Sequence, residues 1–352
     1  MRLLFKLQTL PTVSVAIIVT LFAPWIARAC TRVLLNENAP AVLVGRTMDW
    51  PESTLPIITV FPRGMVRDGG RLGPVVVVHQ NALTWTSKYG TMVTTLYGVG
   101  TADGFNERGL AMHLLYSTNC DFGPRDTSRP GIQAGLWGQY LLDNAATVPE
   151  ALALLDKVQF VMVEYRGHEA LLHLALEDAS GDSAIVEYID GKCIIHHGRQ
   201  YRVLTNDPDY AQQLKLLNAQ DFSNPNRAMP LPGNVHPVDR FQRASYFLAF
   251  LPKTDSERQA VAGLLAIMRN VSVPFGVPYN EDFDTYQTEY RTVMDLTNKR
   301  YFFELTTAPN VIWVDLKDFD LEPGSPVMAL DPDNIDLSGN TTKEFKPINA
   351  PY

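Results

Sequence analysis

The sequence predicts an α+β fold in which two β-sheets carry helices on their outer sides. Strand-like and helix-like segments occur in blocks, in the order strands, helices, strands, helices, strands. A parallel barrel or a dinucleotide-binding fold would instead require regular alternation of the two. No internal repeat, low-complexity tract or linker rich in Gly, Ser or Pro divides the chain. We therefore expect a single domain over residues 30–352.

Alternation of apolar and polar residues predicts the first strands, and turn residues separate them. These strands are expected at residues 31–37, 41–50, 56–64 and 73–79, and residues 91–117 contain further strands with a turn at 106–109. A helical pair follows at residues 131–144 and 148–158, the second with Thr147 as its N-cap.

The second half of the chain repeats this order. Strands are expected at residues 171–178, 183–190, 192–197 and 201–207. Helices are expected at residues 208–218, 238–251 and 256–270. Residues 290–307 predict a β-hairpin, and residues 310–316 predict one more strand.

The first 29 residues predict a secretory signal peptide. Arg2 and Lys6 give a basic start, residues 13–26 are apolar, and Ala27 and Ala29 are small residues of the kind that precede a cleavage site. The apolar run is shorter than the roughly 20 residues of a membrane-spanning helix, and no later segment is long and uncharged enough to span. We expect cleavage after Ala29, which would make Cys30 the first mature residue. A competing interpretation is a lipoprotein signal, in which the Cys30 thiol would carry a lipid.

The charge of the mature chain argues against two classes of partner. Three of the 30 Lys and Arg residues and none of the 38 Asp and Glu residues lie in the leader, so the mature chain has a formal net charge of −11. Nucleic acid and anionic membrane surfaces repel such a chain. Both are therefore poor candidate partners, whereas the charge does not argue against a small-molecule substrate.

Common catalytic and metal-binding motifs are absent from the sequence. It contains no HExxH, CxxC, P-loop or GxSxG pattern. Residues 98–104 are rich in glycine, but their spacing does not match a nucleotide-binding fingerprint, and we expect a turn between strands there. The seven His residues are most simply surface or core groups, and we expect no metal. The three cysteines are too few for a disulfide scaffold, although a bridge between Cys120 and Cys193 stays open.

Cys30 combines two features that activate a nucleophile. After cleavage its side chain is a thiol and its own backbone nitrogen is a free amine, whose pKa near 8 lets it accept a proton around neutral pH. Arg46 and Asp49 follow on a strand that is expected to pair with the one beginning at Cys30. A cation favours thiolate and a carboxylate orients an amine. Strand alternation, however, places Arg46 and Asp49 on opposite faces unless the chain bends.

At this point the sequence resembles the choloylglycine hydrolase and penicillin V acylase family of linear-amide hydrolases, which are N-terminal-nucleophile enzymes. The resemblance covers nearly the whole mature chain and rests on five motifs in order. They are Cys30-Thr31, GRTMDW at residues 45–50, ADGFNERGLAMHLLY at 102–116, VLTNDPDY at 203–210 and LPGNVHPVDRF at 231–241. The family implies a four-layer αββα sandwich of two antiparallel sheets.

The resemblance also implies roles for individual residues. Cys30 matches the nucleophile, Arg46 the cation near its sulfur, and Asp49 the carboxylate that holds its amine. Asn206 matches an asparagine whose amide helps to form the oxyanion hole, and Arg240 an arginine that supports charge in the site. Tyr116 falls at the other oxyanion-hole position, where bile-salt hydrolases have Asn and penicillin V acylases have Tyr.

The implied activity is hydrolysis of a linear amide through an acyl-thioester, with no metal or cofactor. The signal peptide and the long C-terminal end point to the Gram-negative branch, and hence to the periplasm or secretion. Members of that branch resemble penicillin V acylases, and some also cleave N-acyl homoserine lactones. Trp50 and Trp85, with Tyr116, are candidates to line an aromatic acyl pocket, although core packing is the expected fate of at least one of the two tryptophans.

Three questions stay open from sequence alone. Bile-salt hydrolysis is an alternative with the same chemistry, and a non-enzymatic lipoprotein module anchored through Cys30 is an alternative of another class. Arg240 follows Asn206 by 34 positions, a shorter gap than in Gram-positive bile-salt hydrolases, where this region carries an assembly loop. The homotetramer of the family is therefore in doubt for this chain.

Overall fold

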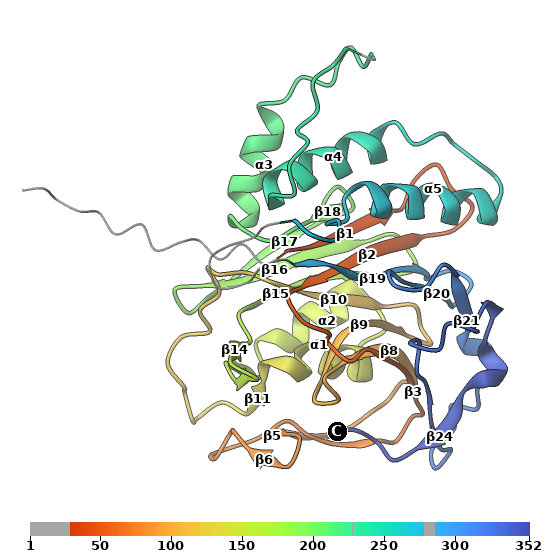
Figure 1. The fold of residues 1–352 in the computed structure, drawn as a ribbon. Coiled ribbons are helices and arrows are strands. Elements are labelled where there is room, and N and C mark those ends of the chain that lie inside the picture. The colour runs from red at the N-terminus through yellow and green to blue at the C-terminus, as the bar shows by residue number, and fades with distance from the viewer. Residues whose placement is uncertain (1–28, 227, 278–285) are drawn as a thin grey trace, which may run out of the picture.

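Four layers stack in this computed structural model, which describes residues 29–226, 228–277 and 286–352 (Figure 1). Helices α3 (Tyr210–Asn218), α4 (Pro237–Ala249) and α5 (Glu257–Asn270) lie over one sheet. A second sheet lies beneath the first, and helices α1 (Trp137–Asn144) and α2 (Val148–Leu155) lie on its far side. The predicted αββα sandwich is confirmed.

The predicted signal peptide falls, apart from Ala29, outside the described residues. Within the described ranges, no helix is both long enough and apolar enough to cross a membrane.

The first sheet has seven strands, and the chain segment that begins at Ala29 lies inside it. Its order is β18 (Val203–Leu204), β1 (Ala29–Leu35), β2 (Leu43–Trp50), β19 (Gln287–Asp295), β20 (Arg300–Leu305), β21 (Ile312–Asp315) and β23 (Gly339–Asn340). Neighbouring strands are antiparallel except at the edge, where β23 pairs in parallel with β21. The predicted pairing of the strand at Cys30 with the strand at Arg46 is confirmed, as is the hairpin over residues 290–307.

The second sheet has nine antiparallel strands. Its order is β17 (Lys192–His197), β16 (Ser183–Ile189), β15 (Leu172–Glu177), β10 (Ala111–Tyr116), β9 (Gly100–Asn106), β8 (Thr91–Leu96), β3 (Ile57–Phe61), β22 (Val327–Leu330) and β24 (Lys346–Ile348). Short two-stranded pairs join β4 (Val66–Asp68) with β7 (Thr84–Thr86), β5 (Arg71–Leu72) with β6 (Val75–Val76), β11 (Gly131–Gln133) with β12 (Gln159–Val161), and β13 (Glu164–Tyr165) with β14 (His168–Glu169). The expected turn at residues 106–109 does separate β9 from β10.

Side-chain caps start the helices where the sequence predicts. The Thr147 side chain accepts a hydrogen bond from the backbone nitrogen of Glu150, which confirms it as the N-cap of α2. Ser256 and Asp209 cap α5 and α3 in the same way. The helix predicted from residue 131 begins later, at Trp137, because residues 131–133 pair with β12 and residues 134–136 form a 3-10 turn.

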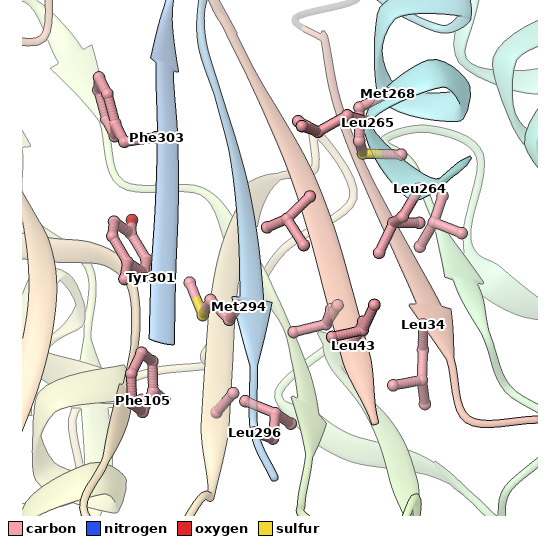
Figure 2. Close-up of a cluster of buried hydrophobic side chains, with 14 of the residues drawn as sticks. Leu34, Leu43, Phe105, Leu264, Leu265, Met268, Met294, Leu296, Tyr301 and Phe303 are labelled. Carbon is pink, nitrogen blue, oxygen red and sulfur yellow. The ribbon is translucent and has the colours of Figure 1, made fainter. Parts of the chain in front are cut away.

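Apolar side chains fill the space on both sides of the first sheet. Figure 2 shows Leu264, Leu265 and Met268 of α5 beside the strands of this sheet. Gly45 of β2 permits this close packing, since a Cβ at that position would lie 2.9 Å from the side chain of Met268. A separate cluster of buried apolar side chains, which includes Trp137 of α1, lies beneath the second sheet.

One predicted strand is wrong in extent. Residues 73–79 were expected to form a full strand, but only Val75 and Val76 do so, and both side chains are exposed. They pair with Arg71 and Leu72 in a surface hairpin whose turn contains Gly73 at φ 56°. The run of valines therefore lies outside both large sheets.

Candidate active site

Cys30 lies on β1 with its side chain buried on the face that looks toward the second sheet. It pairs with Met48 of β2, while the next residue, Thr31, pairs with Thr47 on the helix-covered face. The cysteine is only 2% exposed. Ala29 precedes it through an ordinary peptide bond and pairs with Asp49. The strand therefore holds both the sulfur and the backbone nitrogen of Cys30 in fixed positions.

Arg46 approaches the sulfur from the neighbouring strand. Its Nη2 lies 3.6 Å from Cys30 Sγ and donates a hydrogen bond to the backbone oxygen of Leu114 at 3.0 Å. Burial raises the pKa of the Cys30 thiol above its ordinary value, and the Arg46 guanidinium opposes this by favouring thiolate. The predicted proximity of Arg46 to the sulfur is present in the structure.

Asp49 lies on the opposite face of β2, as strand alternation requires. Its carboxylate accepts hydrogen bonds from the hydroxyls of Thr47, at 3.1 Å, and Thr288. A bulge in β19 lets Thr288 pair with Asp49 and Tyr290 pair with Met48, leaving Glu289 as the extra residue. Burial raises the pKa of Asp49, whereas Arg240 and the two hydroxyls favour its ionised form.

Asn206 bridges the strand of Cys30 and the strand that ends at Tyr116. Its Oδ1 accepts a hydrogen bond from the backbone nitrogen of Cys30 at 2.5 Å, and its Nδ2 donates to the backbone oxygen of Tyr116 at 2.8 Å. The Gln213 side chain of α3 holds the backbone oxygen of Asn206. The side chain of Asn206 is completely buried.

Arg240 reaches from α4 to the same main-chain atoms. Its Nη1 donates to the backbone oxygen of Cys30 at 2.7 Å, and its Nη2 donates to Asn206 Oδ1 at 3.0 Å. The same guanidinium lies 3.8 Å from the Asp49 carboxylate. Arg240 and Asp49 thus face the backbone side of Cys30, while Arg46 faces its sulfur, so no bend of β2 is needed.

An apolar cavity opens at the Cys30 side chain. Its empty volume is about 760 Å³, its open mouth included. Trp50 and Tyr116 line it with ring centroids 5.8 Å apart. Further apolar lining comes from Met48, Leu72, Leu96, Val99, Leu114, Val163 and Leu172. A ligand with an apolar group fits such a surface better than a strongly polar one.

The site thus consists of a buried cysteine beside an apolar cavity, with an arginine near its sulfur and an asparagine hydrogen-bonded to its backbone nitrogen. The family model of linear amide C–N hydrolases, choloylglycine hydrolase family, matches residues 30–335. This chain belongs to the choloylglycine hydrolase family. It is therefore a hydrolase that acts on linear amide C–N bonds other than peptide bonds.

Individual relatives point to one branch of the choloylglycine hydrolase family. The penicillin V acylase of Pectobacterium atrosepticum is 36% identical, over 92% of this chain and 91% of that protein. The solved penicillin V acylase of Agrobacterium tumefaciens is 39% identical with a TM-score of 0.80, over 91% of this chain and 98% of that one. A mutant conjugated bile acid hydrolase from Clostridium perfringens shares the fold, with 20% identity and a TM-score of 0.73, over 88% of this chain and 98% of that one.

The structure does not bring Trp85 to this choloylglycine hydrolase site, which corrects the expectation that it lines the cavity. Trp85 lies on β7 and packs against Tyr140 of α1, with ring centroids 5.3 Å apart. Its indole nitrogen donates to the buried carboxylate of Asp143 at 2.8 Å. Asp143 is also paired with Arg67, so Trp85 belongs to a buried polar group beneath the second sheet.

Sequence reasoning did not anticipate several groups around the site. Thr288, which holds Asp49, and Tyr290, a fully buried tyrosine beside Arg46, depend on the bulge in β19. Desolvation raises the pKa of Tyr290 well above its ordinary value. The hairpin of β13 and β14 supplies Tyr165 and His168 to the cavity lining. Period-two patterns predict strands but carry no signal for a bulge or for which loop meets a cavity.

The cysteines are unpaired in the structure. Cys120 is buried and Cys193 is exposed, and neither forms the disulfide that sequence alone left open. Burial raises the pKa of the Cys120 thiol to about 12, so that residue carries no thiolate near neutral pH. No group of three or more potential metal ligands occurs within the described residues.

Proposed function

We propose that the mature protein is an exported cysteine amidohydrolase of the penicillin V acylase type, with Cys30 as its nucleophile. The observation that carries this proposal is the position of Cys30 Sγ, which lines the apolar cavity and lies 3.6 Å from Arg46 Nη2. The 36% and 39% identities to two penicillin V acylases support the same branch of the family.

The proposed reaction needs only groups of this chain and water. Cys30 Sγ attacks the amide carbon, its proton passes to the terminal amine, and a tetrahedral oxyanion forms. The protonated amine gives that proton to the leaving nitrogen, the C–N bond breaks, and an acyl-thioester remains. Water then attacks the thioester, which releases the carboxylic acid and restores the thiol. The amine exists only after the bond between Ala29 and Cys30 is cut, so the precursor should be inactive.

Asn206 is positioned to serve this reaction in two ways. Its Oδ1 would orient the terminal amine, because it already accepts a hydrogen bond from that nitrogen at 2.5 Å. Its Nδ2 carries two hydrogens, and one of them is used by the backbone oxygen of Tyr116. The second can be donated to the oxyanion. Arg240 would keep Asn206 in this orientation through its 3.0 Å hydrogen bond to Oδ1.

The cavity supports an apolar acyl group as the bound half of the substrate. Trp50 and Tyr116 would contact an aryl ring such as phenoxyacetyl, and the Leu72 and Val99 side chains would extend the surface for a fatty acyl chain. The substrates that fit this description are penicillin V and N-acyl homoserine lactones. Conjugated bile salts are the competing substrate class, because a bile acid hydrolase from Lactobacillus acidophilus is 25% identical over 58% of this chain and 74% of that protein.

A side-by-side assay tests the proposal. Exported wild-type protein and the Cys30→Ser variant are incubated with penicillin V, a long-chain acyl homoserine lactone and glycocholate. We expect hydrolysis of the first two substrates by wild type only, and little glycocholate cleavage. Preferred hydrolysis of glycocholate would move the substrate class to bile salts. Normal activity of Cys30→Ser would exclude the cysteine mechanism.

Export is tested on the same cells. We expect the active species in the periplasmic fraction, or secreted, with a mass that begins at Cys30. A lipid-sized mass increment on the N-terminal peptide would support the lipoprotein interpretation instead. Size-exclusion chromatography of this material would show whether the family's tetramer forms.

A further inference from the structure

Two buried arginines lie side by side in the first sheet. Arg32 of β1 and Arg46 of β2 are direct cross-strand partners, and both side chains are at most 1% exposed. Like charges directly opposite each other destabilise a sheet, and burial makes each unpaired charge more costly. The second sheet must therefore supply compensating charge.

Two carboxylates of the second sheet provide it, and a histidine lies between them. Asp103 of β9 lies 3.9 Å from Arg46 Nη1, and Glu177 of β15 pairs with Arg32. His113 of β10 lies between the two carboxylates, with Nε2 2.7 Å from Glu177 Oε1 and Nδ1 3.8 Å from Asp103 Oδ2. All three side chains are completely buried. An alternating series of charges thus runs from Arg32 through His113 to Arg46 and the sulfur of Cys30.

If the terminal amine of the mature chain is left aside, the charges in this series balance in two ways. The two arginines and the two carboxylates cancel, which leaves His113 and Cys30. The buried group is neutral when the histidine is neutral and the cysteine is a thiol. It is also neutral when the histidine is an imidazolium and the cysteine is a thiolate. An uncompensated charge in a dry interior is strongly disfavoured, so the two ionisations are coupled.

We propose that His113 is a positioning residue whose imidazolium form compensates the Cys30 thiolate. It acts through Asp103 and Arg46, and it touches neither substrate nor sulfur. As an imidazolium it holds both carboxylates in place, so Arg46 stays directed at the sulfur while the series remains neutral. This inference rests on the proposed role of Cys30 as the nucleophile.

The groups packed around His113 are consistent with this role. Burial lowers the pKa of His113, but the Glu177 and Asp103 carboxylates more than offset it and raise that pKa above its ordinary value. The other groups that face this space are hydroxyls held neutral. Thr292 and Tyr301 donate hydrogen bonds to Asp103 at 2.9 and 3.1 Å. The charged or titratable groups that border the space are Arg32 on β1, Arg46 on β2, Asp103 on β9, Glu177 on β15, Tyr290 on β19 and Tyr301 on β20, with Cys30 at its end.

The first test leaves His113 intact. Histidine-labelled wild-type and Cys30→Ser proteins are purified after export, checked by intact mass, and titrated by NMR. Coupling between two sites is reciprocal, so if the imidazolium and the thiolate form together, replacement of the thiol by a hydroxyl lowers the titration midpoint of His113. We expect a midpoint lower by about one pH unit in Cys30→Ser. The same midpoint in both proteins would overturn the proposal.

The second test measures the thiolate directly. Alkylation of Cys30 by iodoacetamide is followed by peptide mass spectrometry against pH, with the exposed Cys193 as an internal reference. In His113→Gln we expect about tenfold slower alkylation of Cys30 at pH 7 and an inflection displaced to higher pH. His173→Gln is the matched control, because His173 is 1% exposed but contacts Glu187 at 3.5 Å instead. An unchanged profile in His113→Gln, or equal slowing in both variants, would contradict the proposal.

The two tests separate this inference from the proposed function. If Cys30→Ser hydrolyses penicillin V normally, the nucleophile assignment is wrong and the inference falls with it. If Cys30→Ser is inactive but His113 does not respond to position 30, only the role of His113 is wrong.

Discussion

The side-chain amide of Asn206 connects Cys30 to Tyr116, accepting from the Cys30 nitrogen at 2.5 Å and donating to the Tyr116 oxygen at 2.8 Å. One residue therefore sets the spacing between the strand of the nucleophile and the strand that lines the cavity. Because the Asn206 side chain is completely buried, its loss would remove a hydrogen bond from a backbone atom of each strand in a site that water does not reach.

Removal of this amide should stop turnover. We expect Asn206→Ala to lower kcat on penicillin V by on the order of a hundredfold or more, since one oxyanion donor contributes about 2.7 to 4 kcal/mol. Asn206→Asp keeps the acceptor for the Cys30 nitrogen but loses the donor, so it should be similarly slow. Far-UV circular dichroism checks that both variants fold. A folded Asn206→Asp with activity within tenfold of wild type would exclude the amide as an oxyanion donor.

Arg46 should control the reactivity of the sulfur. Burial raises the pKa of Cys30 and Arg46 opposes that shift, so loss of the guanidinium should raise the pKa further. We expect Arg46→Ala to alkylate at Cys30 at least about tenfold more slowly than wild type at pH 7, which corresponds to one pKa unit. Arg46→Lys should fall between the two, because it keeps the charge but loses the fork that also binds the Leu114 oxygen. Equal alkylation rates in all three proteins would contradict this role.

Trp85 and Trp50 should have separable effects. Trp85→Phe removes a hydrogen bond to the buried Asp143 carboxylate, and such bonds contribute about 1.5 to 3 kcal/mol. We expect a loss of that order in the free energy of unfolding, measured by urea denaturation, with KM unchanged. A raised KM in a stably folded Trp85→Phe protein would indicate that Trp85 contacts the substrate after all.

Trp50→Leu should instead raise KM for aryl-acyl substrates. The Trp50 ring lines the cavity, and its nitrogen donates to the Tyr97 hydroxyl at 2.9 Å. Tyr97→Phe is the matched variant, because it removes that hydrogen bond and keeps the ring of Trp50. We expect a smaller KM increase for Tyr97→Phe than for Trp50→Leu. No change in KM for either would show that the acyl group binds elsewhere.

Acidification should weaken the fold partly through Glu177. Burial opposes its ionisation, but Arg32 and His113 lower the pKa of Glu177 below its ordinary 4.5. A carboxylate whose folded-state pKa is depressed stabilises the protein above its unfolded pKa, and that stability is lost as pH falls through the folded value. We expect the free energy of unfolding to fall below about pH 5, and to fall less steeply in Glu177→Gln. Parallel pH curves for the two proteins would contradict this.

Local rules in the sequence predicted much of the fold. Thr147 begins a helix because its hydroxyl can accept from a backbone nitrogen of the first turn, and that hydrogen bond forms. The predicted strand at residues 73–79 was too long, because the β-propensity of its valines does not reveal whether a neighbouring strand is present to pair with them. Only two of those residues pair, in a hairpin outside the large sheets. Trp85 misled for a related reason, since an aromatic side chain fits a cavity or a core equally well until its neighbours are known.

The site residues that lie in sequence motifs could be predicted, but the contacts that depend on the packing of the two sheets could not. Arg46 and Asp49 stand three apart, and the alternation that separates them is what lets one face the sulfur and the other the backbone side of Cys30. Asp103 and His113 both lie within the motif at residues 102–116, but their link to Arg46 requires the packing of one sheet on the other. No local pattern encodes that contact.

Whether Cys30 becomes a nucleophile when export exposes its amine can be measured by intact-mass spectrometry of the exported enzyme quenched during turnover of penicillin V. We expect a chain that begins at Cys30 and a transient mass increment of one phenoxyacetyl group on its N-terminal peptide, absent in Cys30→Ser. Normal turnover by a species that retains Ala29 would contradict this expectation.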